Sequence, residues 1–153
     1  MIGRRLLTAD DWREWRALRL RALATDPGAF GSTLADWTGP GDAEERWRRR
    51  FADVPVNLLL DLDGEPVGMV AAVPADDAVE LISLWVVPAA RGRGVGEAAI
   101  DAVVELAGDR PVVLSVRAAN DPAIALYVRC GFVDDGADPD DPLERRMRRA
   151  PRP

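Results

Sequence analysis

Residues 84–96 read LWVVPAARGRGVG, an apolar run that ends at Pro88 and is followed by three glycines spaced two residues apart. Glycines at 92, 94 and 96 allow the backbone to turn so that successive amides point to one place, and a helix that starts there adds the positive end of its dipole. Arg91 and Arg93 add cationic side chains. The stretch therefore predicts a strand, a glycine-rich anion site and a helix, and the expected anion is a pyrophosphate.

Two other kinds of nucleotide-binding loop are also rich in glycine and are alternatives for this stretch. A P-loop requires a lysine after its last glycine, and the sequence contains no lysine. A dinucleotide-binding loop is matched loosely, because Gly94, Gly96 and Ala99 satisfy G-x-G-x-x-A. That loop, however, begins several residues after the strand, and the segment before it reads as a hairpin instead of the first strand of a parallel β-α-β unit.

Helical and strand patterns alternate on both sides of the glycine-rich stretch. A helix over 9–24 would place an apolar arc on one side, with Arg19 inside it; the arc consists of Trp12, Trp15, Leu18, Ala22 and Leu23. Apolar runs at 56–62 and 67–73 flank Asp63-Gly64, which is typical of a hairpin. The other strands are expected at 4–7, 79–87, 112–117, 132–133 and 143–148, and the other helices at 42–52, 94–107 and 121–130, the last capped by Asp121.

This order of elements predicts an α/β fold. Antiparallel strands come first and β-α-β crossovers follow, so we expect a mixed sheet with helices on both faces. A length of 153 residues suits a single domain over residues 1–153.

Composition excludes several classes of function. The net charge of −6 disfavours nucleic-acid binding, and no apolar run is long enough to span a membrane. No signal peptide is recognised, so we expect a cytoplasmic protein. Cys130 is the only cysteine and histidine is absent, which predicts no disulfide and no metal site.

A second motif makes the glycine-rich stretch specific. Residues 120–132 read NDPAIALYVRCGF. Together, the two stretches resemble the V-x-P-x-x-R-G-x-G-x-G and N-x-x-A-x-x-L-Y-x-x-x-G-F motifs of the GCN5-related N-acetyltransferase (GNAT) family. The resemblance implies the GNAT acyl-CoA N-acyltransferase fold, which has a central, mostly antiparallel sheet, helices on both faces and a splayed pair of parallel strands. It also implies acetyl-CoA as co-substrate and no metal.

The resemblance assigns cofactor-binding roles to residues of both motifs. The backbone groups of a bulged strand would bond the pantetheine and hold the thioester carbonyl; these residues are Leu84, Trp85 and Val86. The amides of the loop would hold the pyrophosphate; its residues are Arg91, Gly92, Arg93, Gly94, Val95 and Gly96. Asn120 matches a position that contacts the cofactor, although capping or turn formation explains an asparagine there equally well.

The implied reaction is direct attack of a primary amine on acetyl-CoA in a ternary complex. Tyr127 matches the tyrosine that can protonate the leaving thiolate, and its alternative role is that of a core aromatic residue. Glu80 opens an otherwise apolar strand and is the candidate base; the alternatives are a solvated residue at a strand end, or a water positioned by Ser83.

The acceptor is not readable from the sequence. The acidity of the chain favours a cationic amine, either a small molecule or a peptide, and Phe30 and Trp37 are candidate acceptor contacts because they follow the first helix. A longer acyl donor, a hydroxyl acceptor and a homodimer remain open. The alternative of a different class is a non-catalytic acyl-CoA-binding sensor or interaction module.

Overall fold

The computed structural model describes residues 1–151, and within them seven strands form one sheet in the order β1-β2-β3-β4-β5-β7-β6. The strands are β1 (Ile2–Leu6), β2 (Val56–Leu62), β3 (Glu65–Pro74), β4 (Val79–Val86), β5 (Val112–Arg117), β6 (Val133–Ala137) and β7 (Glu144–Arg149). All neighbours are antiparallel except β4 and β5, which are parallel. The predicted mixed sheet is therefore confirmed.

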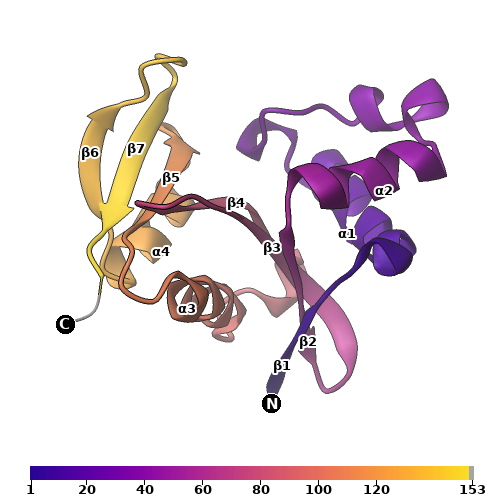
Figure 1. Ribbon diagram of the computed structural model, residues 1–153, viewed down its shortest axis with the longest axis horizontal. Coiled ribbons are helices and arrows are strands. Elements are labelled where there is room, and N and C mark those ends of the chain that lie inside the picture. The colour runs from indigo at the N-terminus through magenta and orange to yellow at the C-terminus, as the bar shows by residue number, and fades with distance from the viewer. Residues whose placement is uncertain (152–153) are drawn as a thin grey trace.

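Helices cover both faces of this sheet (Figure 1). Helices α1 (Trp12–Thr25) and α2 (Glu44–Asp53) lie on one side, and α3 (Val95–Ala107) and α4 (Asp121–Arg129) lie on the other. None of the helices in the described part of the chain has the length and apolar character needed to cross a bilayer.

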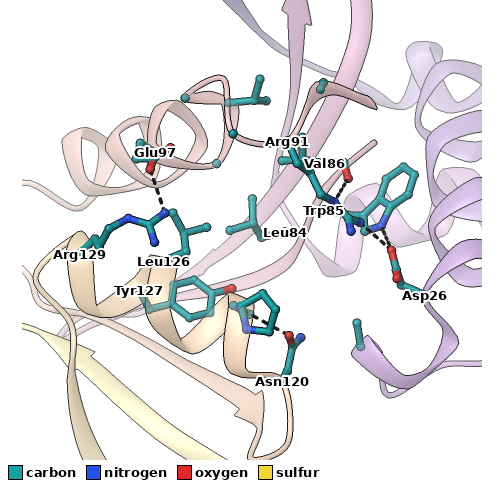
Figure 2. A pocket seen from close by; sticks show the side chains of 18 residues that line it. Asp26, Leu84, Trp85, Val86, Arg91, Glu97, Asn120, Leu126, Tyr127 and Arg129 are labelled. Carbon is teal, nitrogen blue, oxygen red and sulfur yellow. Dashed lines mark hydrogen bonds and ion pairs between the residues drawn. The ribbon is translucent and has the colours of Figure 1, made fainter. Parts of the chain in front are cut away.

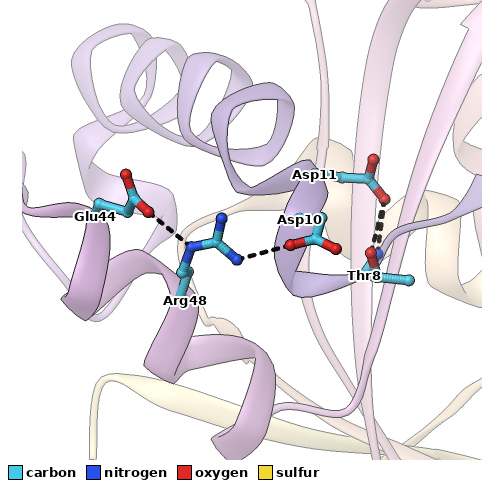
Figure 3. A network of polar contacts seen from close by, with 5 residues as sticks. All are labelled: Thr8, Asp10, Asp11, Glu44 and Arg48. Atoms are coloured by element: carbon cyan, nitrogen blue, oxygen red, sulfur yellow. Dashed lines mark hydrogen bonds and ion pairs between the residues drawn. The ribbon is translucent and has the colours of Figure 1, made fainter.

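The apolar arc predicted for the first helix is the side that α1 buries. Its buried residues are Trp12, Trp15, Leu18, Arg19, Ala22 and Leu23. The chain enters α1 through a 3-10 turn, Ala9–Asp11, in which the Asp11 carboxylate accepts a hydrogen bond from the Thr8 amide at 2.8 Å. Arg48 of α2 bonds Asp10 of this turn and Glu44 of its own helix, which ties α2 to the start of α1 (Figure 3).

The hairpin β2-β3 and the bulge in β4 shape the centre of the sheet. Asp63 and Gly64 form the two-residue turn with φ values of 51° and 88°, the left-handed conformation that such hairpins require. In β4 the pairing with β3 shifts register, because Met69 pairs with Trp85 whereas Ala71 pairs with Ile82. Ser83, inside this irregularity, has a φ of 58°. The strand therefore carries the bulge that was expected.

Strands β4 and β5 are paired only at one end. Their parallel register consists of Val79 with Val112 and Glu80 with Val113. Beyond Glu80 the edge of β4 has no partner in β5 among the described residues. This is the splayed pair of parallel strands, and it leaves the bulged part of β4 open to a ligand.

Helix α4 differs from expectation at its first residue. We expected Asp121 to cap it, but the cap is Asn120, whose Oδ1 accepts a hydrogen bond from the Ala123 amide at 3.3 Å. An N-cap acceptor is most effective when it reaches the N2 or N3 amide, and Ala123 occupies N3 when Asn120 is the cap. Gly131, with a φ of 93°, follows the helix as predicted.

Candidate active site

A cavity of about 540 Å³ opens between the bulged end of β4, the start of α3 and the start of α4. This volume is typical of small-molecule sites. Figure 2 shows Leu84, Leu126 and Tyr127 around its centre. The residues that line it are Asp26, Ala29, Leu84, Trp85, Val86, Ala90, Arg91, Gly92, Gly94, Val95, Gly96, Glu97, Asn120, Pro122, Ala123, Leu126, Tyr127 and Arg129.

Six consecutive backbone amides at the start of α3 have no acceptor among the described residues. Within residues 1–151, none of the amides from Gly92 to Glu97 donates a hydrogen bond to the protein, and the first bonded amide is that of Ala98, which donates to the Gly94 carbonyl at 3.0 Å. The positive φ values of Gly92 (77°) and Gly94 (87°) produce the turn into the helix. Free amides of this kind, together with the helix dipole, form a concave anion site.

The Arg91 amide is already bonded, since it donates to the Pro88 carbonyl at 3.2 Å. Its guanidinium donates to the Val86 carbonyl at 3.0 Å and to the Asp26 carboxylate at 2.7 Å. Arg91 therefore anchors the loop to β4 and to the end of α1, and the amides without a protein acceptor among the described residues begin one residue later.

Asp26 holds three parts of the site together. Its carboxylate also accepts a hydrogen bond from the Trp85 indole Nε1 at 2.7 Å (Figure 2). The bond from Trp85 and the contact with Arg91 keep the pKa of Asp26 below its usual value, against the opposing effect of partial burial. This carboxylate is therefore ionised at neutral pH and fixes the Trp85 side chain away from the free edge of β4.

Tyr127 is buried in the wall of the cavity. Its ring lies edge to face with Phe132, with 5.6 Å between the ring centroids, and 7% of the residue is exposed. Burial raises the pKa of the phenol well above its usual value. The hydroxyl has no hydrogen-bond partner within residues 1–151, so it remains a protonated donor beside the cavity.

Asn120 lies at the cavity as well as at the helix cap. Because its Oδ1 is used by the Ala123 amide, the amide nitrogen of its side chain is the group left to face a ligand. The two interpretations given to this residue, cap and cofactor contact, are compatible in the structure.

Four candidate site residues do not line the cavity: Glu80, Arg93, Phe30 and Trp37. Glu80 lies at the closed end of the β4-β5 pair and forms an ion pair with Arg146 at 3.2 Å. Arg93 is exposed beside the free amides. Phe30 directly follows Ala29, a lining residue, whereas Trp37 packs on Trp47 of α2 at 4.4 Å between ring centroids.

The sequence did not identify several lining residues, among them Asp26, Leu126 and Arg129. Asp26 reads as the end of a helix, and its two partners lie 59 and 65 residues away. Leu126 belongs to the second motif, and its three-residue spacing from Ala123 on a helix is the signal that could have identified it as a neighbour on the same face. Arg129 faces α3, where it forms an ion pair with Glu97 at 3.2 Å.

The splayed parallel strands, the bulge and the glycine-rich entry into α3 define an α/β protein with an open cavity between β4, α3 and α4. Residues 10–132 match the family model for the acetyltransferase (GNAT) family. The chain belongs to this family. A curated relative, the mycothiol acetyltransferase of Clavibacter sepedonicus, is 36% identical over 136 residues, covering 86% of this chain and 42% of that protein.

Solved structures share the fold at low sequence identity. An N-acetyltransferase of Thermoplasma acidophilum in complex with coenzyme A superposes with a TM-score of 0.75 at 16% identity, covering 98% of this chain and 99% of that one. A phosphinothricin acetyltransferase of Sinorhizobium meliloti in complex with acetyl-CoA gives a TM-score of 0.70 at 20% identity, covering 97% and 88%. The chain spans less than half the length of the curated relatives that it matches.

Proposed function

We propose that this protein is an acetyl-CoA-dependent N-acetyltransferase that transfers the acetyl group to a primary amine by direct attack in a ternary complex. The observation that carries the proposal is the run of six free amides from Gly92 to Glu97 at the mouth of a cavity between splayed strands. Family membership and the acetyltransferase names among its relatives support acetyl as the transferred group.

Each part of the donor has a matching part of the cavity. The free amides and the exposed Arg93 provide an anion site for the pyrophosphate. The unpaired edge of β4 from Leu84 to Val86 offers backbone donors and acceptors to the pantetheine amides, in the manner of an added strand. A backbone amide of this edge would also donate to the thioester oxygen as negative charge develops on it.

The proposed chemistry balances with one acid and one base. The amine nitrogen forms a bond to the acyl carbon, the carbon–sulfur bond breaks, and the amine gives up one proton. Tyr127 is proposed to donate its phenolic proton to the leaving thiolate, because its protonated hydroxyl has no other partner and lies beside the cavity.

Glu80 is proposed as the base through an intervening water chain. The carboxylate is ion-paired with Arg146 and does not line the cavity, so direct contact with the amine is not part of the proposal. Ser83, which lies between Glu80 and Leu84 in the sequence at the bulge, is proposed to hold such a water.

The first test is calorimetric titration with acetyl-CoA and with NAD, followed by a free-thiol assay over a panel of amines. The proposal expects acetyl-CoA binding and amine-dependent thiol release. Binding without release over the whole panel would indicate an acyl-CoA-binding module without catalysis. NAD binding in place of acetyl-CoA binding would contradict the assignment of the glycine-rich loop.

A further inference from the structure

Within residues 1–151, the buried Arg19 and the half-buried Arg50 have no carboxylate partner. Arg19 of α1 is 7% exposed, and its Nη1 has no hydrogen-bond partner within residues 1–151. Its guanidinium lies over the face of Phe30, at 4.7 Å from Cζ to the ring centroid. Buried arginines are ordinarily paired, so this one is an exception that requires an explanation.

The second arginine is Arg50 of α2. It donates to the side-chain oxygen of Asn57 and, at 3.4 Å, to Ser83 Oγ, and its guanidinium lies 4.3 Å from the ring centroid of Trp15. These partners are all neutral. Within the described residues neither Arg19 nor Arg50 forms an ion pair, whereas the half-buried Arg16 and Arg117 each pair with a carboxylate.

The two guanidinium groups also repel each other. Burial and the neighbouring charge of Arg19 lower the pKa of Arg50 to about 9. Burial alone lowers the pKa of Arg19 to about 10. Both side chains therefore remain cationic at neutral pH. Two like charges, one buried and one half-buried, with an unused donor destabilise the fold unless an anion joins them.

Neither arginine lines the cavity, but each contacts a residue that is adjacent in sequence to a lining residue. Arg50 reaches Ser83, and the next residue, Leu84, lines the cavity. Arg19 packs on Phe30, and the preceding residue, Ala29, lines the cavity as well. The pair thus borders the bulged part of β4 on the side of α1 and α2, where an acceptor would approach the thioester.

We propose that Arg19 and Arg50 bind an oxyanion of the acceptor, so that the substrate is a primary amine that also carries a carboxylate or a phosphate. This inference rests on the proposed acetyl transfer and names its substrate class. It replaces the expectation of a purely cationic acceptor, which followed from the net charge of the whole chain and not from the charges at this place. Paired guanidinium groups match the planar, two-oxygen geometry of a carboxylate.

The activity test compares amines that differ only in the anion. Amino acids are assayed beside their amides, and O-phosphoethanolamine beside ethanolamine, with thiol release as the readout. We expect kcat/KM to be about 10- to 100-fold higher for one anionic member than for its neutral partner, as charge-assisted bonds to arginine imply. The amino acid and phosphate arms distinguish the two sources of the oxyanion.

A binding test that needs no turnover accompanies it. The melting temperature of the protein is measured with N-acetylglycine, N-acetylglutamate or O-phosphoethanolamine, and with N-acetylglycinamide or ethanolamine as neutral counterparts. We expect at least one anion to raise the melting temperature of the wild type while its neutral counterpart does not. Arg19→Met should abolish the shift and the substrate preference, and Arg19→Lys should restore part of both.

Arg13→Met is the matched control. Arg13 also lies on α1 over an aromatic ring, 4.7 Å from the centroid of Trp12, but it is exposed. Its loss should leave both readouts unchanged. Equal use of anionic and neutral amines, or the absence of an anion-specific shift in melting temperature, would overturn the inference. If the protein still bound acetyl-CoA, that result would leave the proposed function intact. Failure to bind acetyl-CoA would contradict the proposed function, whereas the anion-specific shift does not depend on it.

Discussion

The carboxylate of Asp26 accepts a hydrogen bond from the indole Nε1 of Trp85 at 2.7 Å, although 59 residues separate the two in the sequence. The same carboxylate pairs with Arg91. The end of α1, the bulged strand and the glycine-rich loop therefore meet on one side chain. This explains how a helix terminus with no catalytic group can determine the geometry of the cavity.

Asp26→Ala should weaken both the fold and the binding of acetyl-CoA. Truncation leaves the buried Trp85 indole without its acceptor, so we expect the free energy of unfolding to fall by about 1–2 kcal/mol. Asp26→Asn keeps an acceptor for Trp85 but removes the charge opposite Arg91. Its stability and its affinity for acetyl-CoA should lie between those of the wild type and of Asp26→Ala. Chemical denaturation and acetyl-CoA calorimetry measure the effects. Wild-type affinity in Asp26→Ala would contradict the role of this residue in positioning the loop.

Asp42 should contribute to stability in a pH-dependent way. Two hydrogen bonds to its carboxylate lower the pKa of Asp42 to about 2; the bond from Arg16 has the larger effect and the bond from Trp47 the smaller. Because the folded-state pKa lies below the unfolded value of about 3.9, its contribution is complete above about pH 4 and is lost as the pH falls toward 2. Urea unfolding at several pH values should show a smaller loss of stability over this interval in Asp42→Asn than in the wild type.

The exposed Asp53, which forms no hydrogen bond through its side chain in the structure, provides the control for Asp42. Asp53→Asn should retain the wild-type dependence on pH. Identical pH profiles for the wild type and Asp42→Asn would show that the Arg16 and Trp47 contacts do not favour the ionised carboxylate.

Periodicity and turn chemistry were sufficient to predict the sheet, the buried face of α1 and the loop, because these features depend on residues close in sequence. Long-range polar contacts were not predictable. Nothing local distinguishes Asp26, which bonds Trp85 and Arg91, from a helix-ending aspartate, and nothing local shows that Arg19 and Arg50 meet. The sequence shows that Glu80 opens an apolar strand, but nothing local shows that Arg146 forms an ion pair with it.

Gly96→Ala should disturb the cavity more than the fold. A Cβ at this position would lie 2.9 Å from Leu126 Cδ2, so Leu126, a lining residue, must move. The strain falls on the end of a flexible side chain, and alanine favours the helix by about 1 kcal/mol over glycine. We therefore expect a melting temperature close to that of the wild type together with weaker acetyl-CoA binding. Adding Leu126→Ala should restore part of the lost affinity, as a double-mutant cycle would show.

Glu80→Gln tests the proposed base. If the carboxylate takes the amine proton through water, kcat should fall by about 100-fold and the acidic limb of the kcat–pH profile should disappear. Arg146→Met is the companion variant, because it removes the ion-pair partner and leaves the carboxylate in place. An unchanged profile in Glu80→Gln would assign Glu80 to the structural pair with Arg146 alone.

Tyr127→Phe separates the two roles considered for this residue. The variant keeps the ring that packs against Phe132 and removes only a hydroxyl that has no partner within residues 1–151, so the melting temperature and the Kd for acetyl-CoA should change little. If the hydroxyl protonates the leaving thiolate, kcat should fall by about 100-fold or more. A thioester with a more acidic leaving thiol needs less protonation, and with such a donor the variant should lose much less activity. Equal losses with both donors would show that the hydroxyl does not act on the leaving group, and an unchanged kcat with acetyl-CoA would leave Tyr127 as a wall of the cavity.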